Sequence, residues 1–231
     1  MSKNGLKTKR IFTIPLFAVT IFLLLPSFQR PADPVNEAVE KYYAQQLVLL
    51  KNSIRSFKTK AVQKAPLQLL KNTFRESRLV YKNIAVLISY YSPYATKTLN
   101  GPAIDRIESE VVDQIIAPQG YQAIEQVLFA EKWSTAQYKK LVFLLDEMLA
   151  VMDKLEKEPD RVYQFKTELV WDAMRSALVE LTSNGITGFD SPVANLSIHE
   201  GVASIRGIKA LLHLLQVNLK KEQTTSFSGI D

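Results

Sequence analysis

Residues 198–219 read IHEGVASIRGIKALLHLLQVNL and show the clearest helical periodicity in the chain. Large apolar residues recur there at intervals of three, four or seven, the spacing that aligns side chains on one face of a helix. They are Ile198, Ile205, Ile208, Leu212, Leu215 and Leu219. The stretch predicts a long amphipathic helix that begins near Ser191-Pro192 and turns this stripe toward a hydrophobic core.

Start and stop signals predict further helices upstream. Asp33-Pro34 and Pro66 each open a long helix, the first ending near residue 58 and the second before Ser92-Pro93. Ser134 opens another, because the pair Ser134 and Gln137 forms a capping box. Apolar stripes at helical spacing follow these starts. The stripe residues are Val35, Val39, Tyr42, Leu49 and Ile54; Leu67, Leu70, Phe74, Tyr81 and Ile88; and Leu141, Leu145, Met148, Met152 and Leu155.

Three more helices complete the predicted order. They span residues 103–115, residues 119–130, and a segment that is capped by Asp160 and closed by Asn184-Gly185. The last of these is apolar on more than one side, which predicts a central position. No segment alternates as a strand does. The sequence therefore predicts an all-α fold, an up-and-down bundle of about six helices over residues 33–220, with a polar tail at residues 221–231.

Residues 1–28 have the composition of an export signal. Lys3, Lys7, Lys9 and Arg10 precede an apolar stretch from residue 11 to residue 25, which is shorter than the roughly 20 residues of a membrane-spanning helix. We expect a periplasmic protein, whose first 28 residues are either a cleaved signal peptide or a retained inner-membrane anchor. Any contact with the membrane would run through this anchor alone.

Composition excludes several classes of function. The formal charge is +6, but four of the cations lie in residues 1–28 with no acid beside them, which leaves +2 for the rest. Such a nearly neutral remainder lacks the basic surface of a nucleic-acid-binding protein. The chain has no cysteine, so disulfides, thiolate zinc sites and covalently attached c-type haem are excluded. No phosphate loop or known catalytic motif occurs, and we expect no catalytic residues.

The candidate binding residues lie in two places. Gly120-Tyr121-Gln122-Ala123-Ile124-Glu125, the 120–125 motif, puts Gln122 and Glu125 on one helix face. By spacing alone, this polar pair is more typical of a solvated face. Glu125 is the one candidate metal ligand, and the neutral amide of Gln122 would ligate a metal weakly.

Arg75, Arg78 and Lys82 share a face of the second helix and could clamp an anion or pair with Glu125. The same pattern is also typical of a charged outer face, which we favour. Tyr81 lies beside them. His199 and His213 are roughly 21 Å apart along the last helix, too far to share a metal ion.

The 120–125 motif resembles the Gly-x-His-x-x-Glu motif of imelysin-like proteins, with Gln122 in place of the histidine. Residues 74–82, 99–102 and 118–129 together are similar to the imelysin-like helical region that precedes di-haem cytochrome c peroxidase domains in Bacteroidota-type proteins. Residues 224–231 resemble the linker that leads into the peroxidase domain.

The resemblance implies an all-α periplasmic module associated with haem, iron or peroxide biology. Its partner would be a c-type di-haem peroxidase or another periplasmic redox protein. A second interpretation is an imelysin-like binder of a metal or small ligand, using Gly120, Gln122 and Glu125 with Arg75, Arg78 and Tyr81. A peptidase is a third and weaker interpretation, because the motif histidine is Gln122 here.

Overall fold

The computed structural model describes residues 34–108, 114–157 and 164–227. The elements in chain order are α2 (Pro34–Val62), α3 (Leu67–Tyr91), α4 (Pro93–Asn100), β1 (Arg106–Glu108), β2 (Gln114–Ile116), α5 (Gly120–Leu128), α6 (Thr135–Lys157), α8 (Thr167–Glu180), the π-helical turn η1 (Leu181–Gly185) and α9 (Ser197–Phe227). The predicted all-α helical bundle is confirmed. The predicted signal segment, Asp160 and residues 228–231 lie outside the described residues.

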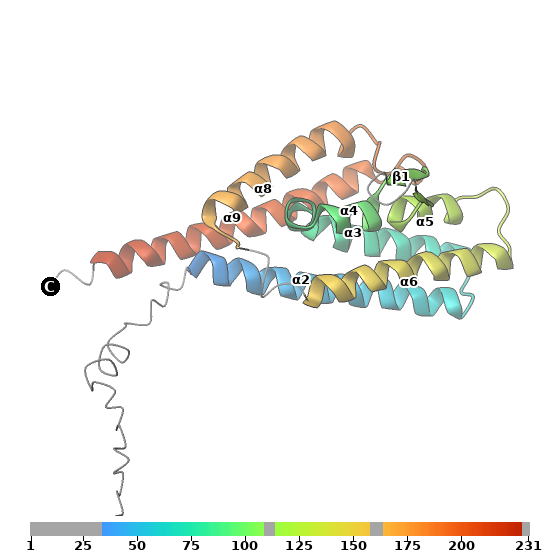
Figure 1. Cartoon of the computed structure of the whole chain (residues 1–231), viewed down its shortest axis with the longest axis horizontal. Helices are drawn as coiled ribbons and strands as arrows, with labels where there is room; N and C mark the ends of the chain where they lie inside the picture. The colour runs from blue at the N-terminus through green and yellow to red at the C-terminus, as the bar shows by residue number, and fades with distance from the viewer. Residues whose placement is uncertain (1–33, 109–113, 158–163, 228–231) are drawn as a thin grey trace, which may run out of the picture. The chain divides into compact units, whose positions relative to one another are not determined.

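The long helices lie side by side in the bundle, with α2 and α8 running in one direction and α3, α6 and α9 in the opposite direction (Figure 1). Helix α3 is central and packs against α2, α8 and α9, while α2 also packs against α6 and α9. The short α5 contacts α3, α4 and α6. Two segments far apart in sequence, α3 and α9, therefore share an extensive interface.

The stripes of α3 and α6 form the core as predicted. In α6 every predicted stripe residue is buried, and in α3 only Leu67 remains half-exposed. Ser134 and Gln137 make the predicted capping box, because the Ser134 N–H donates to Gln137 Oε1 at 3.0 Å and the Ala136 N–H donates to Ser134 Oγ at 3.2 Å. In α2 the predicted Val35, Val39 and Ile54 are buried, whereas the predicted Leu49 is exposed. The middle of the buried stripe is formed by Tyr43, Leu47 and Leu50.

The predicted stripe of α9 is wrong in its first half. Ile198 is 81% exposed and Ile205 is 44% exposed, whereas Glu200, Ala203 and Gly207 face the interior. The reason is close packing: a Cβ on Gly207 would overlap the backbone carbonyl of Asn83 in α3. In this half of α9, Gly207 thus lies against α3, whereas Ile198, Val202 and Ile205 point away from the core.

The predicted helix over residues 103–115 is also wrong. Strands β1 and β2 pair antiparallel there, with Arg106 opposite Ile116 and Glu108 opposite Gln114. The physical reason lies in the β-branched pair Ile115-Ile116, which favours a strand.

Three predicted boundaries and one predicted position need correction. Residues 93–100, which lie beyond the predicted end of the second helix, form α4, because Pro93 suits the first turn of a helix. Helix α9 begins at Ser197, after a turn that includes Ser191-Pro192, and it continues through Phe227 into the predicted tail. Helix α8 is not central, since Trp171 and Val179 are exposed. None of the helices in the described ranges is long and apolar enough to cross a membrane.

Replacing Gly207 by alanine should destabilise the protein by about 1–3 kcal/mol, the usual cost of overpacking, because the new Cβ would push α9 away from α3. Urea denaturation would measure the change. Gly201→Ala in the same helix is the matched control: its Cβ would meet only Leu181 Cδ1, at 3.4 Å, and alanine favours the helix by about 1 kcal/mol. A Gly207→Ala protein as stable as this control would contradict the packing.

Candidate functional site

The 120–125 motif opens α5 at a position that only glycine fits. Gly120 has a φ of 72°, in the left-handed region, and a Cβ there would collide with the backbone carbonyls of Thr98 and Leu99. The start of α5 is therefore pressed against the end of α4. This contact turns Gln122 and Glu125 into the interior of the bundle, where both are buried.

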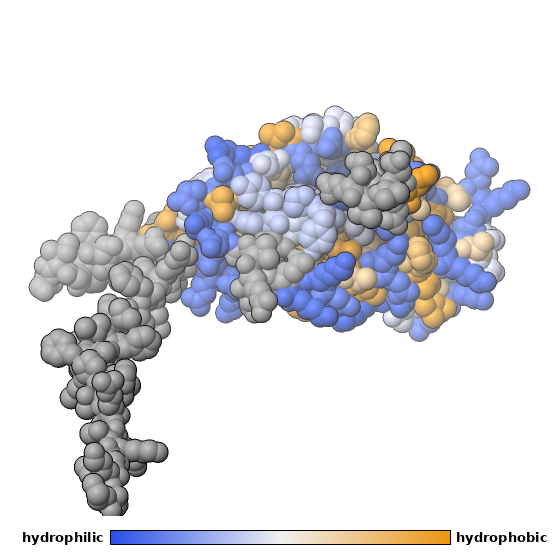
Figure 2. All heavy atoms as spheres, in the orientation of Figure 1, coloured by the Kyte–Doolittle hydropathy of each residue, from blue (hydrophilic) through white to orange (hydrophobic). Residues whose placement is uncertain are grey.

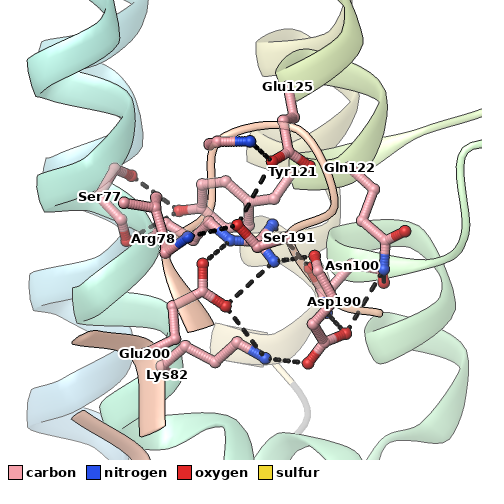
Figure 3. Close-up of polar contacts among 12 residues, drawn as sticks. Ser77, Arg78, Lys82, Asn100, Tyr121, Gln122, Glu125, Asp190, Ser191 and Glu200 are labelled. Carbon is pink, nitrogen blue, oxygen red and sulfur yellow. Dashed lines mark hydrogen bonds and ion pairs between the residues drawn. The ribbon is translucent and has the colours of Figure 1, made fainter. Parts of the chain in front are cut away.

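Glu125 holds the 186–196 segment, which leads from η1 to α9. Its Oε1 accepts the backbone N–H groups of Ala194 at 2.5 Å and Val193 at 3.2 Å, together with the Ser191 hydroxyl at 3.3 Å (Figure 3). Ser191 Oγ in turn accepts the N–H of Leu196 at 3.1 Å. The solvated-face interpretation of this carboxylate is wrong, and its contacts are with the chain's own backbone.

Gln122 also makes internal hydrogen bonds, to the end of α4 and to the 186–196 segment. Its Nε2 lies 3.3 Å from the Asn100 carbonyl oxygen and 3.4 Å from Asp190 Oδ1. The Asn100 side chain also donates to Asp190 Oδ1, at 3.2 Å. Gln122, which occupies the position of the histidine in the imelysin-like motif, thus joins the end of α4 to the 186–196 segment.

Arg78 lies at the centre of these contacts and is fully buried (Figure 3). Its Nε and one terminal nitrogen, NH2, donate to the two carboxylate oxygens of Glu200, the second at 3.1 Å. NH1 donates to Asn100 Oδ1 at 3.1 Å, and NH2 also donates to the backbone carbonyl of Asp190. One guanidinium therefore connects α3, α4, the 186–196 segment and α9.

Lys82 adds a second cation one helical turn further along α3. Its Nζ lies 2.5 Å from Asp190 Oδ2 and 3.7 Å from Glu200 Oε2. We call Arg78, Lys82, Asp190 and Glu200 the charge cluster. The preferred outer-face interpretation is therefore wrong for Arg78 and Lys82, although Arg75 is exposed as that interpretation expects.

Aromatic packing closes the site on the α5 side. Tyr81 and Tyr121 are buried with ring centroids 5.4 Å apart. The Tyr121 hydroxyl lies 2.7 Å from Ser77 Oγ and donates to the Ser77 carbonyl at 3.1 Å. Burial raises the pKa of both phenols well above the ordinary value, so both stay neutral and act as hydrogen-bonding and packing groups.

Burial acts on the carboxylates with different results. It raises the pKa of Glu125, and the backbone N–H of Ala194 and the charge of Arg78 offset this only in part. It also raises the pKa of Glu180, although Lys82 lies near. At Asp190 burial is outweighed by the charge and hydrogen bond of Lys82 together with the charge of Arg78 and the hydrogen bond from Asn100, so the pKa of Asp190 falls below its ordinary value. Of these three carboxylates, only that of Asp190, which is in contact with a cation, has its ionised form favoured.

The space beside the charge cluster is small. A cavity of about 20 Å³ is lined by Lys82, Glu180, Asp190 and Glu200, among others. This volume suits one water molecule, not a substrate. Among the described residues, no three His, Asp or Glu side chains are grouped so as to hold a metal ion.

The site thus joins residues that the sequence named separately with others that it missed. Arg78, Gln122, Glu125 and Tyr81 meet, whereas Arg75 lies outside. Asp190, Ser191 and Glu200 were not predicted. The sequence does carry one signal for Glu200, because this residue begins the buried face of α9 that continues through Ala203, Gly207 and Leu211.

The comparisons with known proteins give no relative. A scan against models of known protein families finds no match, and a search of curated proteins finds no sequence that matches the chain. The functional argument therefore rests on the geometry of the site and the surface.

Replacing Arg78 by methionine should lower the free energy of unfolding by about 3–5 kcal/mol, because it leaves the buried carboxylate of Glu200 without its main partner. Chemical denaturation would measure the loss. Arg75→Met, three residues earlier and exposed, is the control and should change stability by no more than about 0.5 kcal/mol. Equal effects of the two substitutions would contradict the assignment of Arg78 as the central contact.

Glu180→Gln should become increasingly stabilising as the pH rises. The pKa of Glu180 is raised by burial in the folded chain, so the wild-type protein is favoured below the ordinary glutamate pKa and loses that contribution as the pH rises through the folded value. Glutamine carries no charge to desolvate. We expect the stability difference to widen between about pH 4 and pH 7, measured by thermal unfolding.

The control for this pH series is Glu168→Gln, an exposed substitution on the same helix. It removes one charge from the surface without changing a buried group, so it should shift stability less over the same range. A Glu180→Gln difference that stays constant with pH would show that the carboxylate is not held in an unfavourable environment.

Proposed function

We propose that this chain is a non-catalytic, exported helical module that docks on a haem-bearing periplasmic partner of the di-haem cytochrome c peroxidase type. The observation that carries the non-catalytic part of the proposal is the state of the 120–125 motif. Glu125 and Gln122 both make hydrogen bonds within the protein. Glu125 accepts from the backbone of the 186–196 segment, and Gln122 donates to Asn100 and Asp190. The haem-bearing partner comes from the sequence resemblance.

The geometry favours docking over small-ligand binding. The charge cluster is enclosed and its neighbouring cavity has room for about one water. A metal or ligand at Glu125 would have to displace the backbone N–H groups of Val193 and Ala194. By contrast, the outer side of α9 exposes several large apolar residues, as protein-binding surfaces do.

The proposal predicts that the protein recovers a c-type cytochrome from its own periplasm. The tagged full chain would be purified from the native host, and haem would be read from the absorption spectrum and from haem staining of the recovered polypeptides. We expect haem on a second polypeptide only. Elemental analysis of the same samples tests the alternative, since stoichiometric metal on the isolated chain that Glu125→Ala removes would favour the metal binder. Recovery of no cytochrome would count against the docking proposal.

A further inference from the structure

The outer side of α9 forms an apolar groove with its neighbour η1. One wall is Leu181 and Ile186, and the other is Ile198, Val202 and Ile205. Gly201 forms part of the lining, and a Cβ there would already touch Leu181. The groove encloses about 550 Å³ and is open to solvent along its length. We call it the α9 groove.

The walls of the α9 groove are unusually exposed for aliphatic side chains. Ile186 is 66% exposed and Val202 is 47% exposed, and Ile198 is the most exposed large apolar residue among those described. Figure 2 shows that hydrophobic residues, in orange, reach the surface elsewhere too, between hydrophilic ones in blue. In the α9 groove the apolar residues of two elements are contiguous and concave, as on surfaces that another molecule covers.

Charge distinguishes the two ends of the α9 groove. Arg206 and Lys209 line it on the C-terminal side, both exposed and neither paired with a carboxylate among the described residues. No acidic residue lines it. The one acid of α9 between Ser197 and Leu219 is Glu200, which points into the charge cluster on the opposite side.

This charge pattern argues against a second copy of the chain as the occupant. Two copies related by a two-fold axis would each bring the same patch, so Arg206 and Lys209 would meet apolar residues or like charges and find no carboxylate. The complementary surface is apolar along most of its length and acidic at one end.

Dimensions point to a helix as the occupant. From Ser197 to Lys209 the α9 groove runs for roughly 18 Å, at 1.5 Å per residue. About three turns of an amphipathic helix have this length, and such a helix presents apolar side chains at i, i+3, i+4 and i+7. Such side chains would insert between the two walls of the α9 groove.

We infer that the α9 groove binds an amphipathic helix of a partner protein, with its apolar face between Ile186 and Val202 and carboxylates on Arg206 and Lys209. The inference names the surface and the partner chemistry for the docking proposed above, and it rests on that proposed function.

The test uses synthetic helical peptides and the full chain. A fluorescein-labelled, lactam-bridged peptide of about 14 residues would carry leucines at i, i+3, i+4 and i+7 and three glutamates in one terminal turn. Two such peptides would be made, with the glutamates at either end, because the direction of the bound helix is open. In charge-reversed twins, lysine replaces each glutamate. Fluorescence anisotropy would give the dissociation constants.

We expect one acidic peptide to bind at micromolar concentration and its twin at least tenfold more weakly. Val202→Glu should weaken binding of the acidic peptide at least tenfold. Val217→Glu, the matched control in the same helix outside the groove at 38% exposure, should not. Exchanging both cations, Arg206→Glu with Lys209→Glu, should reverse the preference toward the basic twin.

Several outcomes would overturn the inference. They are failure of every peptide to bind, equal effects of Val202→Glu and Val217→Glu, or an unchanged preference after the charge exchange. Binding of phosphatidylglycerol vesicles but of no peptide would assign the surface to a membrane instead. A concentration-dependent dimer in sedimentation that Val202→Glu abolishes would assign it to a second copy.

The two proposals can fail separately. If the wild-type chain recovers a c-type cytochrome and Val202→Glu recovers it equally well, docking stands and the α9 groove is not its site. If no cytochrome is recovered but the peptide series behaves as expected, the groove stands and the partner belongs to another class.

Discussion

A guanidinium that is removed entirely from water must find acceptors for its donors, and the fold around Arg78 is arranged to supply them. Burying an ion costs several kcal/mol, and its ion partner repays this only when the remaining hydrogen bonds are also made. Here the carboxylate of Glu200, the amide of Asn100 and the carbonyl of Asp190 supply those bonds. Four parts of the chain must therefore adopt one relative position.

The 120–125 motif extends this constraint to a segment with little regular structure. Residues 186–196 have no helix or strand ladder to satisfy their N–H groups, and Glu125 accepts two of them. Because the same segment carries Asp190 into the charge cluster, the position of α5 and the pairing of Lys82 are linked. A motif that a sequence comparison would read as a ligand site is, in this geometry, the support of a loop.

The sequence was most informative where one physical signal dominated. The stripes of α3 and α6 and the capping box at Ser134 follow directly from helical spacing and local hydrogen bonding, and the structure confirms them. Spacing was less informative for α9, because residues that could pack in a core recur at helical spacing on two different faces of that helix. The choice between them depended on how closely Gly207 approaches Asn83, a tertiary contact that no local pattern encodes.

The same limit applies to the site. Arg78 and Glu125 were recognised as candidates, but their burial was not, since an isolated polar pair on a helix is usually solvated. Their partners Asp190 and Glu200 come from a different part of the chain, so the cluster could be seen only when α3 and α9 were brought together.

The distance along the chain between these partners has a consequence for how the protein folds. Arg78 and Glu200 are 122 residues apart, so the interior of α3 cannot take its final form until the start of α9 is present. Closing so long a loop is slow compared with forming the local helices. During synthesis Arg78 must therefore stay hydrated until α9 is present to supply the carboxylate of Glu200.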